Sequence, residues 1–101
     1  MPTQYKTFRD FYPFYLSEHR HPVCRRLHFI GSTLVLAAIA AAILTRNAWW
    51  LAAAPIAGYG FAWVGHFFFE KNRPATFTYP WYSFLGDWAM WRDTLMGKIK
   101  L

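Results

Sequence analysis

The chain has 101 residues, which is enough for one domain, and 55% of them are hydrophobic and 22% aromatic against 16% charged. A soluble domain of this length cannot usually bury so much apolar surface. The single cysteine, Cys24, excludes an internal disulfide. The net charge of +6 would suit nucleic acid, but the charged side chains lie outside two uncharged runs, residues 27–45 and 48–69. That distribution favours a membrane over nucleic acid as the partner.

Residues 1–21 are expected to hold an amphipathic helix that lies in the membrane interface. Pro13 should break or kink this helix, because proline lacks the amide that the helix interior needs. The aromatic side chains that repeat at the spacing of one helical face are Phe8, Phe11, Tyr12 and Tyr15.

Two membrane spans are predicted, at residues 22–45 and 48–70, because each apolar run meets the roughly 20 residues that a helix needs to cross hydrocarbon. Pro22 suits the first position of the first span. The link Arg46-Asn47 is so short that the two helices must be antiparallel neighbours. All Lys and Arg residues except Arg46 fall on the side of the two termini, so the positive-inside rule predicts that both termini are cytoplasmic.

Residues 78–97 are expected to form a second interfacial helix, which Pro80 can open. The predicted fold is therefore an all-α membrane protein, residues 1–101 as a single domain, built as a two-span antiparallel hairpin with an amphipathic helix at each end. Small residues should allow close helix contact, although they could also be ordinary lipid-facing positions; they are Gly31, Ala38 and Ala42 on the first span and Gly58, Ala62 and Gly65 on the second.

The four histidines are the only concentrated chemistry in the sequence. In an antiparallel hairpin His28 and His66 both lie roughly 26 Å from the turn and therefore share one depth. His19 and His21 precede the first span and could fold over the mouth of the hairpin. Because imidazole commonly binds iron, copper and zinc, the pattern predicts a metal site. The alternative is that the histidines are interfacial polar residues, and for His21 this second interpretation is preferred.

Charged residues beside the histidines have two interpretations each. Glu70 lies one helical turn after His66, so it could complete the metal site or orient a ligand, or it could pair with a neighbouring cation. A guanidinium matches a carboxylate, but anchoring to anionic lipid explains the same arginines equally well; they are Arg25, Arg26 and Arg73.

Two segments resemble the signatures of a family of small membrane-bound 2-hydroxy fatty acid dioxygenases, known from phytosphingosine breakdown. The first segment is HRHPVCRRLHFIG at residues 19–31, and the second is GHFFFE at residues 65–70, followed by Arg73-Pro74-Ala75. The resemblance covers nearly the whole chain. It implies an iron(II) enzyme that uses dioxygen to shorten a 2-hydroxy fatty acid by one carbon.

Matched residue by residue, the resemblance gives catalytic and metal-binding roles to His19, His28 and His66, with Glu70 as a catalytic companion. His21 is a fourth candidate ligand, at a position where many members have another polar residue. Departures at Cys24 and Ala62, where many members have asparagine and glutamine, resemble a bacterial branch and imply a bacterial inner membrane. The substrate carboxylate would be bound by Arg25, Arg26 or Arg73.

The expected partners are membrane lipid, a fatty acid and dioxygen, and the sequence leaves a homo-oligomer open. The main alternative is a non-enzymatic membrane protein, with an assembly or lipid-organising role, in which the histidines are structural. A proton or metal carrier is disfavoured because the spans hold no polar residue at mid-membrane that could relay an ion. Zinc is not excluded as the metal, and it would change the chemistry from oxygen activation to hydrolysis.

Overall fold

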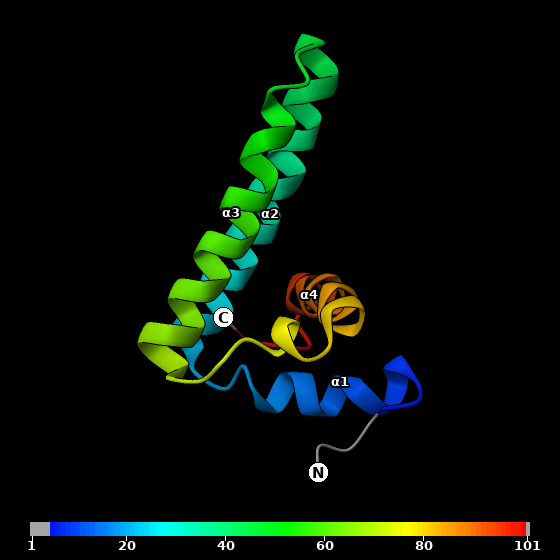
Figure 1. Ribbon diagram of the computed structural model, residues 1–101, viewed down its shortest axis with the longest axis vertical. Coiled ribbons are helices and arrows are strands. Elements are labelled where there is room, and N and C mark those ends of the chain that lie inside the picture. Colours follow the sequence, from blue (N-terminus) through cyan, green and yellow to red (C-terminus); the bar gives the residue numbers. More distant parts are fainter. Residues whose placement is uncertain (1–4, 101) are drawn as a thin grey trace.

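The computed structural model describes residues 5–100, and within that range the chain is helical with no strand (Figure 1). Two helices form a long antiparallel hairpin, and two further helices lie beside its lower part, opposite the turn; this lower region is the base of the molecule (Figure 1). This arrangement confirms the predicted all-α hairpin. The elements in chain order are α1 (Phe8–Ser17), α2 (Pro22–Thr45), α3 (Trp50–Val64), the π-helix η1 (Gly65–Glu70), the 3-10 helix η2 (Ala75–Phe77) and α4 (Pro80–Leu95).

The hairpin turns where the sequence predicts. Arg46 adopts the left-handed conformation with φ 54° and ends α2. The Asn47 side chain then accepts a hydrogen bond from the Trp49 amide at 3.0 Å, which starts the return helix. α2 begins at Pro22 and rises about 36 Å over its length, more than the roughly 30 Å of a hydrocarbon core. It and the continuous segment Trp50–Glu70 are both long and apolar enough to cross a membrane.

Glycines allow the two long helices to approach closely. A Cβ atom on Gly31 would lie 3.0 Å from the Ala57 carbonyl oxygen and 3.0 Å from Phe61 Cβ. One on Gly58 would lie 3.2 Å from Val35 Cγ2. The two glycines therefore sit in the helix contact, as small residues do where helices pack by van der Waals contact alone.

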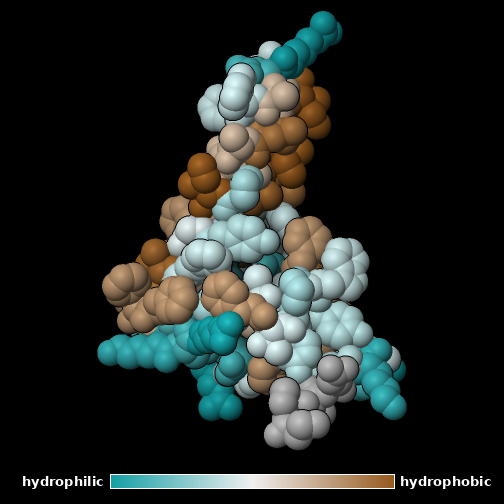
Figure 2. Space-filling view, viewed as in Figure 1, coloured by the Kyte–Doolittle hydropathy of each residue, from teal (hydrophilic) through white to brown (hydrophobic). Residues whose placement is uncertain are grey.

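The upper part of the hairpin presents apolar side chains to its surroundings. Ile43, Leu44 and Ile56 are 70%, 83% and 74% exposed. Figure 2 shows this as a mostly hydrophobic column above a mixed base, with hydrophilic atoms at the tip. A contiguous apolar surface of this extent indicates contact with lipid or with another protein.

The base is an aromatic cluster between α1 and α4. Its central side chains, Phe11 and Tyr15, are 0% and 1% exposed. They flank Pro13, and α1 continues through that proline from Phe8 to Ser17. Pro13 therefore does not break the helix, and the alternative expectation of a kink at Pro13 stays a prediction. Proline cannot donate a main-chain hydrogen bond, and the packing of Phe11 and Tyr15 on either side of Pro13 offsets the loss of that bond.

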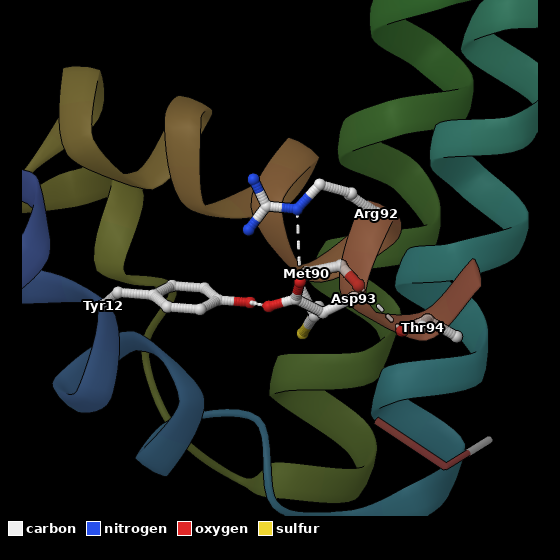
Figure 3. Close-up of polar contacts among 5 residues, drawn as sticks. All are labelled: Tyr12, Met90, Arg92, Asp93 and Thr94. Atoms are coloured by element: carbon white, nitrogen blue, oxygen red, sulfur yellow. Dashed lines mark hydrogen bonds and ion pairs between the residues drawn. The ribbon is translucent and has the colours of Figure 1, made fainter. Parts of the chain in front are cut away.

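Polar bonds fix α4 on two sides. Figure 3 shows Asp93 accepting a hydrogen bond from the Tyr12 hydroxyl of α1 at 2.8 Å and an ion-paired bond from Arg92 Nε at 3.1 Å. On the opposite side, Trp91 Nε1 donates to Thr33 Oγ1 of α2 at 3.0 Å. As a result α4 is held across the base of the hairpin.

Candidate metal centre

Three imidazoles from three separate segments meet at the base of the hairpin. His19 comes from the loop between α1 and α2, His28 from the second turn of α2, and His66 from η1. Their exposed fractions are 1%, 5% and 2%. The ring centroids of His28 and His66 lie 5.0 Å apart, and each is 4.5 Å from that of His19. One ligand atom from each residue falls within 4.8 Å of the other two.

The Nδ1 atoms of His19 and His28 are both occupied by main-chain oxygens. His19 Nδ1 lies 2.6 Å from the Tyr15 carbonyl oxygen, and His28 Nδ1 lies 2.8 Å from the Cys24 carbonyl oxygen. A carbonyl oxygen can only accept, so each Nδ1 must carry the hydrogen. In the neutral ring this leaves Nε2 with a bare lone pair. The two Nε2 atoms are 3.1 Å apart.

Asn72 makes Nδ1 the hydrogen-bond donor of the third imidazole as well. Its Oδ1 lies 2.6 Å from His66 Nδ1, while its Nδ2 donates to the Glu18 carbonyl oxygen at 3.1 Å. The second bond fixes which end of the amide faces the histidine, so His66 Nδ1 is the donor there. An oxygen partner behind each ring is the usual support for histidines that bind a metal.

Two bare lone pairs 3.1 Å apart cannot form a hydrogen bond with each other, whereas both could bind one cation placed between His19 and His28. Burial and the neighbouring imidazoles of His28 and His66 hold the pKa of His19 well below its usual range. A proton is therefore a poor choice of cation. The separation equals that of two nitrogen ligands about 2.1 Å from one ion at roughly a right angle. The donor set fits a first-row transition metal.

Local backbone features bring His66 and Asn72 into place. Gly65 sits so close to α2 that a Cβ atom there would lie 2.9 Å from Cys24 Sγ. The following turn is a π-helix, a feature that often occurs at functional sites. Lys71 then takes the left-handed conformation with φ 58°, and the Asn72 amide donates to the His66 carbonyl oxygen at 3.0 Å. The chain reversal returns Asn72 to the imidazole.

The remaining predicted ligands lie outside the group of three. His21 caps α2, because its Nδ1 accepts from the Val23 amide at 3.1 Å. The backbone amide of His21 donates to the Glu70 carboxylate. This bond ties η1 to the loop that carries His19. A catalytic role for Glu70 and metal binding by His21 stay predictions.

The three predicted carboxylate-binding arginines have different surroundings. Arg25 Nε donates to the His19 carbonyl oxygen at 2.6 Å and so holds the loop. The Arg73 guanidinium lies 5.0 Å from the ring centroid of Phe77, and Arg26 is exposed. Their role toward a substrate stays a prediction.

Sequence reasoning did not identify the side chains that support the histidines from behind, which are Tyr15, Asp87 and Asn72. The Tyr15 ring stacks on His19 with centroids 4.1 Å apart, and its hydroxyl donates to Asp87 of α4. Burial raises the pKa of Tyr15 well above its usual range and that of Asp87 to about 6. Tyr15 could be recognised in the sequence as part of the aromatic face of α1. No feature of the sequence pointed to Asn72, because helical spacing does not place it beside His66.

Comparison with known proteins agrees with this geometry. A sequence model described as 2-hydroxy-palmitic acid dioxygenase Mpo1-like matches residues 5–99, a range that includes all three histidines and Asn72. No curated protein and no solved structure matches the chain significantly. The family match covers nearly the whole chain, and on that basis the chain belongs to the Mpo1-like family of 2-hydroxy-palmitic acid dioxygenases.

Proposed function

We propose that this protein is a membrane-embedded, iron(II)-dependent dioxygenase that shortens a 2-hydroxy fatty acid by one carbon. The observation that carries the proposal is the set of three buried imidazoles whose Nδ1 atoms are all engaged by oxygens, which leaves three Nε2 atoms for one ion. Three protein ligands leave coordination positions free for substrate and dioxygen. Bound iron(II) would supply the redox chemistry that activates oxygen.

The proposed reaction balances without a separate reductant. One 2-hydroxy acid and one O₂ give the acid one carbon shorter, one CO₂ and one water, and the bond that breaks joins C1 to C2. The protein's part is to hold the imidazoles neutral, to orient them and to keep bulk water away. Burial of His19, His28 and His66 supports all three tasks.

The membrane setting suits an amphiphilic substrate. We propose that α2 and the segment Trp50–Glu70 cross the bilayer, with α1 and α4 in the interface and both termini cytoplasmic, in a bacterial inner membrane. The histidines at the base of the hairpin then lie at the level where a fatty acid holds its polar end, and its tail points toward the hydrocarbon. The exposed apolar side chains of the upper hairpin support this placement.

The test is a chain-shortening assay on protein purified in detergent and loaded with iron(II). The wild-type protein should release CO₂ from a 2-hydroxy fatty acid labelled at C1, only in the presence of oxygen. His66→Ala should abolish release, whereas His21→Ala, which removes a histidine outside the group of three, should retain most of it. Wild-type protein that binds iron and releases no CO₂ would overturn the enzymatic proposal. Activity with zinc in place of iron would overturn the assignment of the metal.

A further inference from the structure

A cavity of about 230 Å³ begins at His28 and runs beside the hairpin under α4. One face of each surrounding helix lines it. α2 contributes positions spaced by four and three residues, α3 contributes positions spaced by one, three, one and three residues, and α4 contributes one turn. The residues, helix by helix, are His28, Ser32 and Val35; Ala54, Pro55, Gly58, Tyr59 and Ala62; Phe84, Asp87 and Trp88.

Polar atoms gather at one end of this cavity. Ser32 lies one helical turn beyond His28, and Asp87 faces them from α4. The bond from Tyr15 occupies one carboxylate oxygen of Asp87 and leaves the other for a ligand. Ser32 and Asp87 can therefore hydrogen-bond a hydroxyl or a carboxyl group held beside His28. Beyond Ser32 the lining side chains are apolar apart from the Tyr59 hydroxyl and the Trp88 indole N–H, which suits a hydrocarbon chain.

The length of the cavity follows from helix geometry. The lining residues on α3 run from Ala62 to Ala54, a rise of about 12 Å. An extended alkyl chain advances roughly 1.25 Å per carbon, given a C–C bond of about 1.52 Å. The cavity therefore spans roughly ten carbons, and it leads away from the histidines along the apolar hairpin.

We infer that this cavity is the acyl chamber of the enzyme: the head of a 2-hydroxy fatty acid lies between His28, Ser32 and Asp87, and the first part of its chain lies between the hairpin and α4. The inference rests on the proposed function for the identity of the substrate. It adds that the protein encloses the chain next to the reacting carbons, so that side chains in the middle of the cavity govern which chains fit. α4 is the wall that makes this enclosure, since Trp91 and Asp93 fix it on both sides.

Val35 is the position at which to test the chamber. It lies at the middle of the cavity wall, and its Cγ2 faces Gly58 across the helix contact. Val35→Phe should fill the chamber, whereas Leu36→Phe adds a ring at the next residue, which is 40% exposed and does not line the cavity. With a series of 2-hydroxy fatty acids, V35F should lower turnover of long chains relative to short ones by about tenfold or more, while L36F should leave the ratio within about twofold.

A measurement without turnover keeps the inference separate from the proposed function. A 2-hydroxy fatty acid with a photoreactive diazirine in the middle of its chain is irradiated with the wild-type protein, and the labelled residues are identified by mass spectrometry. Labels should fall on Val35, Tyr59 or Trp88, and V35F should reduce them several-fold. If the acid is shortened but the labels fall on the outer face of the hairpin, the chamber is wrong while the function stands. If the labels fall in the cavity and no acid is shortened, the chamber stands and the function fails.

Failure of V35F to fold would be visible as loss of bound iron. In that case the labelling pattern of the wild-type protein alone tests whether the acyl chain lies in the cavity. A chain-length profile that is the same for V35F and L36F, with both proteins retaining iron, would overturn the inference.

Discussion

The Nε2 atoms of His19 and His28 lie 3.1 Å apart, although both rings already donate their Nδ1 hydrogens to main-chain carbonyl oxygens. The carbonyls belong to Tyr15 and Cys24, each four residues before the histidine it orients. Main-chain carbonyl oxygens of α1 and α2 therefore determine the tautomer of both rings, without an acidic side chain. A cation bound between the rings would stabilise this arrangement, so we expect metal binding and folding of the base to be coupled.

Removing Asn72 should weaken metal binding without removing a ligand. Asn72→Ala leaves His66 free to rotate and to change tautomer, because Oδ1 no longer accepts from Nδ1. We expect a loss of about 10–100-fold in iron(II) affinity, the usual cost of losing such a partner. Competition with a chelator measures the affinity. The matched control is Asn47→Ala at the tip of the hairpin, which should leave it unchanged, and equal affinities for N72A and the wild type would contradict the role of Asn72.

Metal should stabilise the fold through the three histidines. A ligand that binds only the folded protein adds about 2.7 kcal/mol at a hundred times its dissociation constant. Iron(II) should therefore raise the midpoint of thermal unfolding of the wild type in detergent under anaerobic conditions. His28→Ala should lose the increase and His21→Ala should keep it. An equal increase in both variants would show that the ion binds elsewhere.

The hairpin could be predicted from the sequence because its cause is local. Two long uncharged runs joined by Arg46-Asn47 leave one arrangement, and antiparallel pairing alone brings His28 to the level of His66. The position of His19 follows less directly, since the chain must fold back from α1. Asn72 could not be predicted, because the π-helix and the left-handed Lys71 break the helical spacing on which the prediction depends. The same limit applies to Asp87, which reaches Tyr15 only through the packing of α4 on α1.

Asp87 should make stability depend on pH in a defined direction. Burial raises the pKa of its carboxyl from 3.8 to about 6, so the folded protein favours the protonated form. Its contribution is fully present below pH 3.8 and is lost as the pH rises through about 6. The amide of Asp87→Asn stays neutral throughout. The variant should therefore gain stability relative to the wild type between pH 4 and pH 7, by at most about 3 kcal/mol.

Chemical unfolding of the metal-free proteins at a series of pH values measures this difference. Asp10→Asn is the matched control for the loss of one acidic side chain, because Asp10 is exposed at the start of α1. A constant difference between D87N and the wild type from pH 4 to pH 7 would show that Asp87 is ionised in the fold.

Gly65 should tolerate a side chain poorly, and a side chain there should disturb the metal centre. In an open helix position alanine is more stable than glycine by roughly 0.5–1 kcal/mol, and Gly60, with no atom within 4 Å of an added Cβ, should show that gain on Gly60→Ala. At Gly65 the same methyl group meets Cys24 Sγ at 2.9 Å and the Cys24 Cα at 3.2 Å. Gly65→Ala should therefore push η1 away from α2 and move His66 from the other two imidazoles. Iron affinity should fall together with stability.

A double variant separates this clash from a general effect on the helix. Cys24→Ala removes the sulfur and should restore part of the stability and iron affinity that G65A loses, with a coupling on the order of 1 kcal/mol between the two positions. Restoration stays partial because the Cys24 main chain also crowds the site. Additive effects of G65A and C24A would show that the loss arises outside this contact, and the close approach at Gly65 would then not be what positions His66.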